Sequence, residues 1–270
     1  MVPIYLSVSP FGADRLAEAA RIARAAGCVA ADVSSALLPD GRCPAALEGL
    51  PVAVVSVSWQ LQRRPNLAAW LDVARHLGAE TLNVYASLGA GDEAEEAREA
   101  LLRDIRACLA ARGEHGPGLT LENALEPPSG LAATFDAWLG ILKAVDSPDF
   151  RGTLDAANFV ACGDGGSLGR VAGGAAPWIG YVHAKGVVPF DEGLSRREPF
   201  RRVWQGAGRW LAAPAGEGSP DYRELLGGLF RAGYRGAVCI EPFDQEAPVR
   251  SAAAFLRDVI ESTLPPGDGP

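Results

Sequence analysis

Strand-like and helix-like patterns alternate along the whole chain. Eight short segments have the residue pattern of strands: residues 4–9, 29–34, 52–58, 81–86, 119–123, 152–155, 180–185 and 237–241. Between them, apolar residues recur at the 3.6-residue spacing of helices, over residues 13–26, 67–77, 93–112, 129–145, 222–231 and 247–260. Alternation of this kind predicts βαβ units and a parallel sheet.

Eight strand patterns favour a closed (β/α)8 barrel, a single α/β domain, over an open sheet. An open dinucleotide-binding sheet carries GxGxxG after its first strand, and the segment SPFGAD at residues 9–14 has no such fingerprint. Gly27, Gly78, Gly113 and Gly233 follow predicted helices, as left-handed C-caps do. We expect the barrel to span residues 1–263 and a flexible tail rich in Pro and Gly to occupy residues 264–270.

Four of the predicted strands end in a side chain that can bind a metal ion. The segments LTLENA, RGTLDAANF, YVHAKG and VCIEPF place Glu122, Asp155, His183 and Glu241 at corresponding positions. Side chains alternate across a strand, so each of the four is compatible with pointing inward at the C-terminal rim of a barrel. Buried ionisable groups are costly alone but tolerable around a cation. One imidazole with oxygen ligands suits Mn²⁺, Mg²⁺ or Co²⁺, and Zn²⁺ is an alternative.

The connection between the last two strand patterns is long. His183 and Glu241 are 58 positions apart, whereas Asp155 and His183 are 28 apart. The excess lies in residues 186–219, which we interpret as an extended loop on the active face and a candidate lid. Its arginines and tryptophans could cap a substrate, and a solvated surface is the alternative. These residues are Arg196, Arg197, Arg201, Arg202, Trp204 and Trp210.

Charge and composition exclude several classes of protein. The formal net charge of −8 argues against a nucleic-acid binder, which would need a basic face. Five cysteines without a CxxC pair indicate free thiols in a reducing cytoplasm. The segment MVPIYLSVSPFG is not a signal peptide, and no apolar run is long enough to span a bilayer. We therefore expect a soluble cytoplasmic protein with no membrane partner.

The same segments, together with IYLSVSPFG near the N-terminus and GEGSPDY before the last strand pattern, resemble the xylose isomerase-like TIM barrels. This family is also described as sugar phosphate isomerases and epimerases. The resemblance implies that Glu122, Asp155, His183 and Glu241 bind one divalent ion. It also implies that Glu122 and Glu241 are the catalytic pair that transfers a proton. A small sugar or sugar phosphate would be the substrate, and dimers or tetramers are common among such barrels.

An α-hydroxy ketone or aldehyde fits this site, because a divalent ion would stabilise the enediolate that forms when a carbon gives up its proton. Return of the proton to the opposite face gives epimerisation, and its return to the neighbouring carbon gives isomerisation. Two alternatives remain, a lyase of the inosose-dehydratase kind and a non-catalytic barrel that binds a carbohydrate or a partner. An endonuclease IV-like enzyme is disfavoured, because its zinc cluster needs several histidines and this chain has three in all.

Further residues are candidates for substrate binding. Asn158 lies three residues after Asp155, where the family often has His, and Lys185 matches the family's HxK pattern. Trp59 and Tyr85 end the third and fourth strand patterns, so they could line the pocket or pack in the core. The other two histidines are predicted to lie at a helix end and in a solvated turn. They are His76 and His115.

Overall fold

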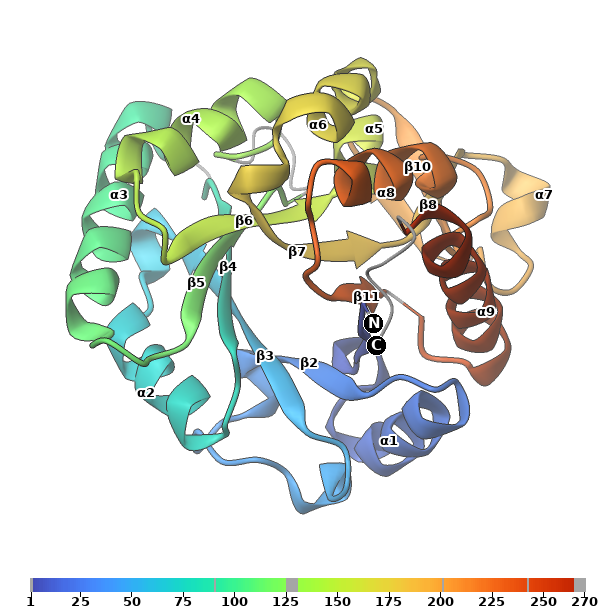
Figure 1. Ribbon diagram of the computed structural model, residues 1–270, viewed down its shortest axis with the longest axis horizontal. Coiled ribbons are helices and arrows are strands. Elements are labelled where there is room, and N and C mark those ends of the chain that lie inside the picture. Colours follow the sequence, from blue (N-terminus) through green and yellow to red (C-terminus); the bar gives the residue numbers. More distant parts are fainter. Residues whose placement is uncertain (1, 90, 125–130, 201, 242, 265–270) are drawn as a thin grey trace.

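The eight predicted strands form, and they pair in parallel into a closed barrel (Figure 1). The computed structural model describes residues 2–89, 91–124, 131–200, 202–241 and 243–264. In order around the barrel, the strands are β1 (Ile4–Ser7), β2 (Ala30–Ser34), β3 (Val52–Gln60), β4 (Thr81–Ser87), β5 (Gly118–Glu122), β6 (Phe150–Asp155), β7 (Ile179–Ala184) and β11 (Val238–Ile240). β11 closes the ring on β1, with Tyr5 opposite Cys239.

The helices predicted from apolar spacing surround this ring (Figure 1). They are α1 (Leu16–Ala25), α2 (Leu67–His76), α3 (Ala94–Ala111), α4 (Phe135–Val145), α8 (Tyr222–Arg231) and α9 (Glu246–Thr263). The predicted start of α4 at residue 129 lies outside the described residues. Two short helices after β6 were not predicted, α5 (Ala156–Ala161) and α6 (Leu168–Gly174). Between β2 and β3, the short 3-10 helices Ser35–Leu37 and Ala45–Leu47 replace a regular helix.

The helix ends follow the chemistry of the sequence. Gly27, Gly78, Gly113 and Gly233 have φ between 70° and 94°, which confirms them as left-handed residues that terminate helices. Asn66 begins α2 by accepting a hydrogen bond from the backbone N–H of Ala69 (3.2 Å). In the part of the chain that the structure describes, no helix has both the length and the apolar character needed to cross a membrane.

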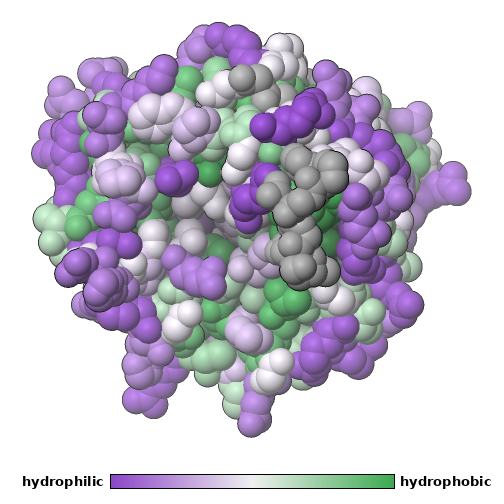
Figure 2. Space-filling model, in the orientation of Figure 1, coloured by the Kyte–Doolittle hydropathy of each residue, from purple (hydrophilic) through white to green (hydrophobic). Residues whose placement is uncertain are grey.

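Apolar side chains fill two regions, one between the strands and the helices and a smaller one inside the barrel. The inner set is Tyr5, Ala30, Ala53, Val54, Tyr181, Ala237 and Cys239. Outside the barrel, Gly152 of β6 lets Trp138 of α4 approach closely, because a Cβ at this position would lie 1.9 Å from the indole. Figure 2 shows mainly hydrophilic side chains around the rim of one face, as expected for helices that bury one side only.

Residues 186–219 are not the irregular loop that the sequence suggested. They contain a three-stranded antiparallel sheet of β8 (Gly186–Pro189), β10 (Arg209–Ala213) and β9 (Val203–Gln205), with the short helix α7 (Glu192–Ser195). Val187, Leu211 and Ala212 are fully buried in it. These strands have only three to five residues each and are separated by charged stretches, so their pattern was too short to recognise.

Candidate metal centre

The structure brings Glu122, Asp155, His183 and Glu241 together at the C-terminal ends of their strands. One ligand atom from each lies within 4.8 Å of the ligand atoms of the others. His183 Nδ1 is 3.4 Å from Glu122 Oε1 and 3.5 Å from Glu241 Oε1, so both glutamates lie beside it. Strand register explains the convergence, because Asp155 pairs with His183 and Glu122 pairs with Tyr85 across neighbouring parallel strands. We call these four residues the candidate metal centre.

Two atoms of the candidate metal centre are buried without a hydrogen-bond partner among the described residues. They are His183 Nδ1 and Asp155 Oδ2, the latter in contact with the ammonium of Lys185. Asp155 Oδ2 is ion-paired with Lys185, whereas a buried imidazole nitrogen without a hydrogen bond costs about 1–3 kcal/mol and is rarely kept without a function. An imidazole nitrogen and carboxylate oxygens facing one point are suitable donors for a divalent cation. The residues present therefore fit such an ion.

Lys185 follows β7 and turns its ammonium group into the candidate metal centre. It forms ion pairs with both Asp155 and Glu241 and is 4% exposed. Its Nζ also lies 5.0 Å from the centroid of the Trp204 ring. Lys185 is a substrate-binding candidate from the HxK pattern, as a partner for an enediolate oxygen or an anionic group. In the structure, its ammonium neutralises two carboxylates of the protein.

Burial and charge pairing oppose each other in this cluster. Burial raises the pKa of Asp155, against the attraction of Lys185. For Glu241, burial alone would raise the pKa, but His183 and Lys185 outweigh it and lower the pKa to about 2. Burial would likewise lower the pKa of His183, and the charges of Glu241 and Glu122 raise it well above its ordinary value. Each charge is thus stable only because its neighbours carry the opposite sign.

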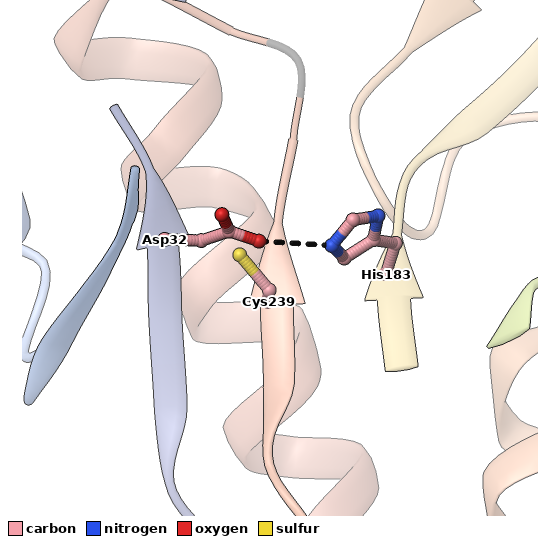
Figure 3. A group of neighbouring side chains, drawn as sticks. All are labelled: Asp32, His183 and Cys239. Atoms are coloured by element: carbon pink, nitrogen blue, oxygen red, sulfur yellow. Dashed lines mark hydrogen bonds and ion pairs between the residues drawn. The ribbon is translucent and has the colours of Figure 1, made fainter. Parts of the chain in front are cut away.

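The second nitrogen of His183 faces Asp32 of β2 (Figure 3). His183 Nε2 lies 3.1 Å from Asp32 Oδ2, and both side chains are buried. The Asp32 carboxylate also accepts hydrogen bonds from Ser56 Oγ (2.7 Å) and the Tyr181 hydroxyl (3.2 Å). A carboxylate in this position favours a proton on Nε2, which leaves the lone pair of Nδ1 directed at the candidate metal centre. Asp32 was not singled out from the sequence.

Asp32, His183 and Cys239 form a second group of potential ligands (Figure 3). Both carboxylate oxygens of Asp32 already accept hydrogen bonds, and burial raises the pKa of the Cys239 thiol well above its ordinary value. Metal ions bind thiolates rather than thiols. This group therefore suits a cation less well than the candidate metal centre does. Its Asp32 carboxylate instead orients the His183 ring.

Asn83 of β4 joins the candidate metal centre to the barrel interior and was also missed in the sequence. Its amide nitrogen donates to Glu122 Oε2 (3.1 Å) and to Ser56 Oγ (3.2 Å). Its amide oxygen accepts from Thr120 (3.1 Å) and Thr153 (2.8 Å). Asn83 is fully buried, so all its hydrogen-bonding groups act on the protein. It fixes the orientation of Glu122 through one carboxylate oxygen.

A pair of asparagines fixes Asp155. Asn123 donates to the backbone oxygen of Asp155 (2.7 Å) and accepts from its backbone N–H (2.7 Å). Asp155 Oδ1 accepts from the backbone N–H of Asn158 (3.1 Å), as an N-cap of α5 does. The Asn158 side chain donates to the backbone oxygen of Asn123 (3.0 Å). One oxygen of Asp155 is thus used for the fold, and the other contacts Lys185 at the candidate metal centre.

A cavity of about 280 Å³ opens above the candidate metal centre. Its lining residues are Ser7, Ser9, Asp32, Ser34, Ser56, Tyr85, Glu122, Ala124, Asn158, His183, Lys185, Trp204 and Glu241. Tyr85, Asn158 and Lys185, predicted to bind substrate, therefore line it. Burial raises the pKa of Tyr85. Trp204 brings the 186–219 segment to the cavity, as a lid would require.

Trp59 does not reach the cavity, contrary to the possibility considered from the sequence. It is fully buried, and its indole N–H donates to Asp104 of α3 (2.9 Å). Alternation along β3 gives the reason, because Ser56 lines the cavity and a residue three positions later must face the opposite side. Trp59 packs between the barrel and the helices, where Val57 also lies. The exposed His76 and His115 do not belong to the site either.

Comparison with known proteins agrees with this architecture. A family model described as "Xylose isomerase-like TIM barrel" matches residues 8–259, and the chain belongs to that family. A xylose isomerase-like TIM barrel protein from Mycobacterium smegmatis, solved in complex with magnesium, is 17% identical, with a TM-score of 0.74 and 98% coverage of both chains. An IOLI protein with a bound zinc atom is 14% identical, with a TM-score of 0.72 and coverage of 98% of this chain and 99% of that one.

An L-ribulose 3-epimerase is 18% identical to this chain, with a TM-score of 0.70 and coverage of 97% of this chain and 96% of that one. At these identities, the three likenesses show the fold. No curated protein matches this chain in sequence.

Proposed function

We propose that this protein is a divalent-metal-dependent isomerase or epimerase acting on a sugar or a sugar derivative. The observation that carries the proposal is that Glu122 and Glu241 both lie close to His183 Nδ1, at 3.4 and 3.5 Å, below a cavity. Two carboxylates that converge on one point can each serve as acid or base toward a carbon held there. The family and its 3-epimerase relative support the same reaction class.

The roles of the side chains follow from their surroundings. A bound divalent ion would supply charge stabilisation for a carbonyl oxygen and its neighbouring hydroxyl. Glu241 lies beside His183 and Lys185 as a carboxylate, and we assign it the role of the base that takes the proton from carbon. Glu122 is oriented by Asn83 and, in its protonated form, can deliver a proton to the resulting enediolate. Return to the same carbon gives an epimer, and return to the neighbouring carbon gives an aldose–ketose pair.

Solvent exchange tests the proposal directly. The protein is incubated with Mn²⁺ and a panel of ketoses in D₂O, and deuterium at the carbon next to the carbonyl is measured by NMR. Glu122→Gln and Glu241→Gln are each expected to lower the exchange rate at least about 100-fold, because each removes a general acid–base group. Glu261→Gln on the exposed side of α9 is the matched control and should exchange like the wild type. Full activity in either site variant would refute the assigned roles.

The same experiment separates the alternatives. A lyase would produce an absorbing α-dicarbonyl compound in place of an exchanged sugar. A non-catalytic carbohydrate-binding barrel would show no exchange with any member of the panel. Elemental analysis of the purified protein would identify the ion, for which magnesium and zinc in similar structures provide precedents. Manganese as the native ion, a cytoplasmic location and a dimeric or tetrameric state stay predictions.

A further inference from the structure

We propose that the substrate is an uncharged polyhydroxy carbonyl compound, an unphosphorylated sugar, and that a sugar phosphate is disfavoured. This inference rests on the proposed function and adds the chemical class of the substrate. It depends on which side chains line the cavity and on which of their charges are already paired.

Hydroxyl groups make up one wall of the cavity. Ser7, Ser9, Ser34, Ser56 and Tyr85 line it, and all come from β1 to β4 or the turn after β1. The four residues of the candidate metal centre come from the other half of the barrel, β5 to β7 and the end of β11. A substrate held at the candidate metal centre would therefore face this hydroxyl wall across the barrel mouth.

The hydroxyl wall has free capacity for hydrogen bonds. Ser9 Oγ accepts from the backbone N–H of Ser34 (3.0 Å), and Ser34 Oγ accepts from that of Ala36 (3.3 Å). A serine hydroxyl can donate one hydrogen and accept two, so Ser9 keeps its own hydrogen available. Ser34 also bonds Tyr85, and Ser56 already donates to Asp32. Groups that both donate and accept match the hydroxyl groups of a sugar chain. A phosphate only accepts hydrogen bonds and prefers charged donors.

The cations at the cavity are already paired. Within the described lining residues, the basic side chains are Lys185 and His183. Lys185 pairs with Asp155 and Glu241, and His183 stands between Asp32 and the two glutamates. With a divalent ion bound and His183 neutral as its ligand, the four carboxylates Asp32, Glu122, Asp155 and Glu241, the ion and Lys185 leave one net negative charge. A phosphate dianion would add two negative charges to a site that already carries an excess.

The arginines of residues 186–219 that the structure describes do not supply a phosphate clamp. Arg196 pairs with Glu192 and its side chain is 75% exposed. Arg209 lies over the Phe190 ring at 3.6 Å, which uses its planar face. Arg197 and Arg202 are exposed and Arg201 lies outside the described residues, so no described arginine of this segment lines the cavity. Bidentate arginines are the usual recognition device for phosphate.

The 186–219 segment offers an aromatic surface in place of those arginines. Trp204 on β9 lines the cavity and pairs across the sheet with Trp210 on β10. An indole ring can pack on the C–H side of a sugar. The cavity thus combines an aromatic surface, a hydroxyl wall and a cation centre, which together match a neutral sugar.

Matched pairs of substrates test the inference, for example D-ribulose with D-ribulose 5-phosphate and D-fructose with D-fructose 6-phosphate. With Mn²⁺ in D₂O, we expect kcat/KM for exchange to be at least about 100-fold higher for the free ketose than for its phosphate ester. A higher value for an ester would overturn the inference and leave the proposed function standing. Absence of exchange with every free and phosphorylated sugar would overturn the proposed function. Calorimetric titration of the Mn²⁺-loaded protein would then decide whether free sugars or phosphate esters bind. Tighter binding of the esters would count against the inference.

Variants of the hydroxyl wall give a second readout. Ser9→Ala and Ser34→Ala are each expected to raise KM for the free ketose about tenfold with little change in kcat, as the loss of one hydrogen bond does. Ser251→Ala on the exposed side of α9 is the matched control. Unchanged KM in both wall variants, with circular dichroism showing intact folding, would refute the role of the hydroxyl wall.

Discussion

Asp32 provides the sharpest test of how the candidate metal centre is organised. Removing it by Asp32→Ala deletes the acceptor 3.1 Å from His183 Nε2, so the imidazole loses the partner that fixes its proton and ring orientation. Loss of such an outer partner typically weakens metal affinity about 10–100-fold, or about 1.4–2.8 kcal/mol. We expect an effect within that range, because Asp32 is 2% exposed and water cannot easily replace it.

Folding stability must be measured in parallel, because Asp32 also accepts hydrogen bonds from Ser56 and Tyr181. Each buried hydroxyl left without an acceptor costs about 1–3 kcal/mol. Tyr181→Phe is the matched control, since it removes a bond to Asp32 but leaves the contact with His183 intact. We expect it to change metal affinity less than about threefold. Asp32→Asn should lie between the two variants, because an amide oxygen can still accept from Nε2–H.

Calorimetric titration with Mn²⁺ measures the affinities, and NMR of ¹⁵N-histidine in the Mg²⁺-loaded protein reports the ring. The chain has three histidines, and His76 and His115 are exposed, so the buried His183 signal can be assigned from its protection. The wild type should show a proton on Nε2, and Asp32→Ala should lose its slow exchange with solvent. Wild-type metal affinity and an unchanged His183 signal in Asp32→Ala would refute the orienting role.

Two further predictions concern stability. Adding a divalent ion at 100 times its Kd should stabilise the fold by about 2.7 kcal/mol and raise Tm by roughly 5–10 °C. In a thermal scan, EDTA should reverse this shift. An unchanged Tm would contradict a metal site. Gly152→Ala should lower the free energy of unfolding by about 1–3 kcal/mol or more, because its Cβ would overlap Trp138. The control Gly140→Ala in α4 has open space around it and should be neutral or stabilising. Urea unfolding measures both variants.

The barrel and its candidate metal ligands could be predicted because both depend on a two-residue period along single strands. Glu122 and Asp155 each end a strand, and parallel pairing then brings all such ends to one rim. For Trp59, pocket lining and core packing were both open from the sequence, and the structure shows core packing. It ends an apolar segment, but counting from Ser56 puts it on the outer face. A position at the end of a strand does not decide which face of the strand the side chain points to. An odd or even separation from a residue of known direction does decide it.

Asp32 and Asn83 could not be recognised from their own segments. Each lies inside a strand that has further polar residues, AADVS and TLNVYAS, and neither has a ligand-like spacing to the candidate metal ligands. Their roles depend on the registers that connect β2 to β3 and β3 to β4, which bring Ser56 between them. Those registers follow from closure of the whole barrel, and a local pattern does not contain them.

The interior of the barrel shows why the polar residues form one continuous network. Toward the N-terminal ends of β1, β2, β7 and β11, inward positions are apolar, as at Tyr5 and Tyr181. Buried carboxylates placed directly above such a layer would be very unstable without partners. Asp32 and Asn83 supply those partners, each binding one residue of the candidate metal centre and both binding Ser56. Because this network occupies only one side of each ligand, Nδ1 of His183 stays directed at the cavity, where the reacting carbon of a sugar would lie.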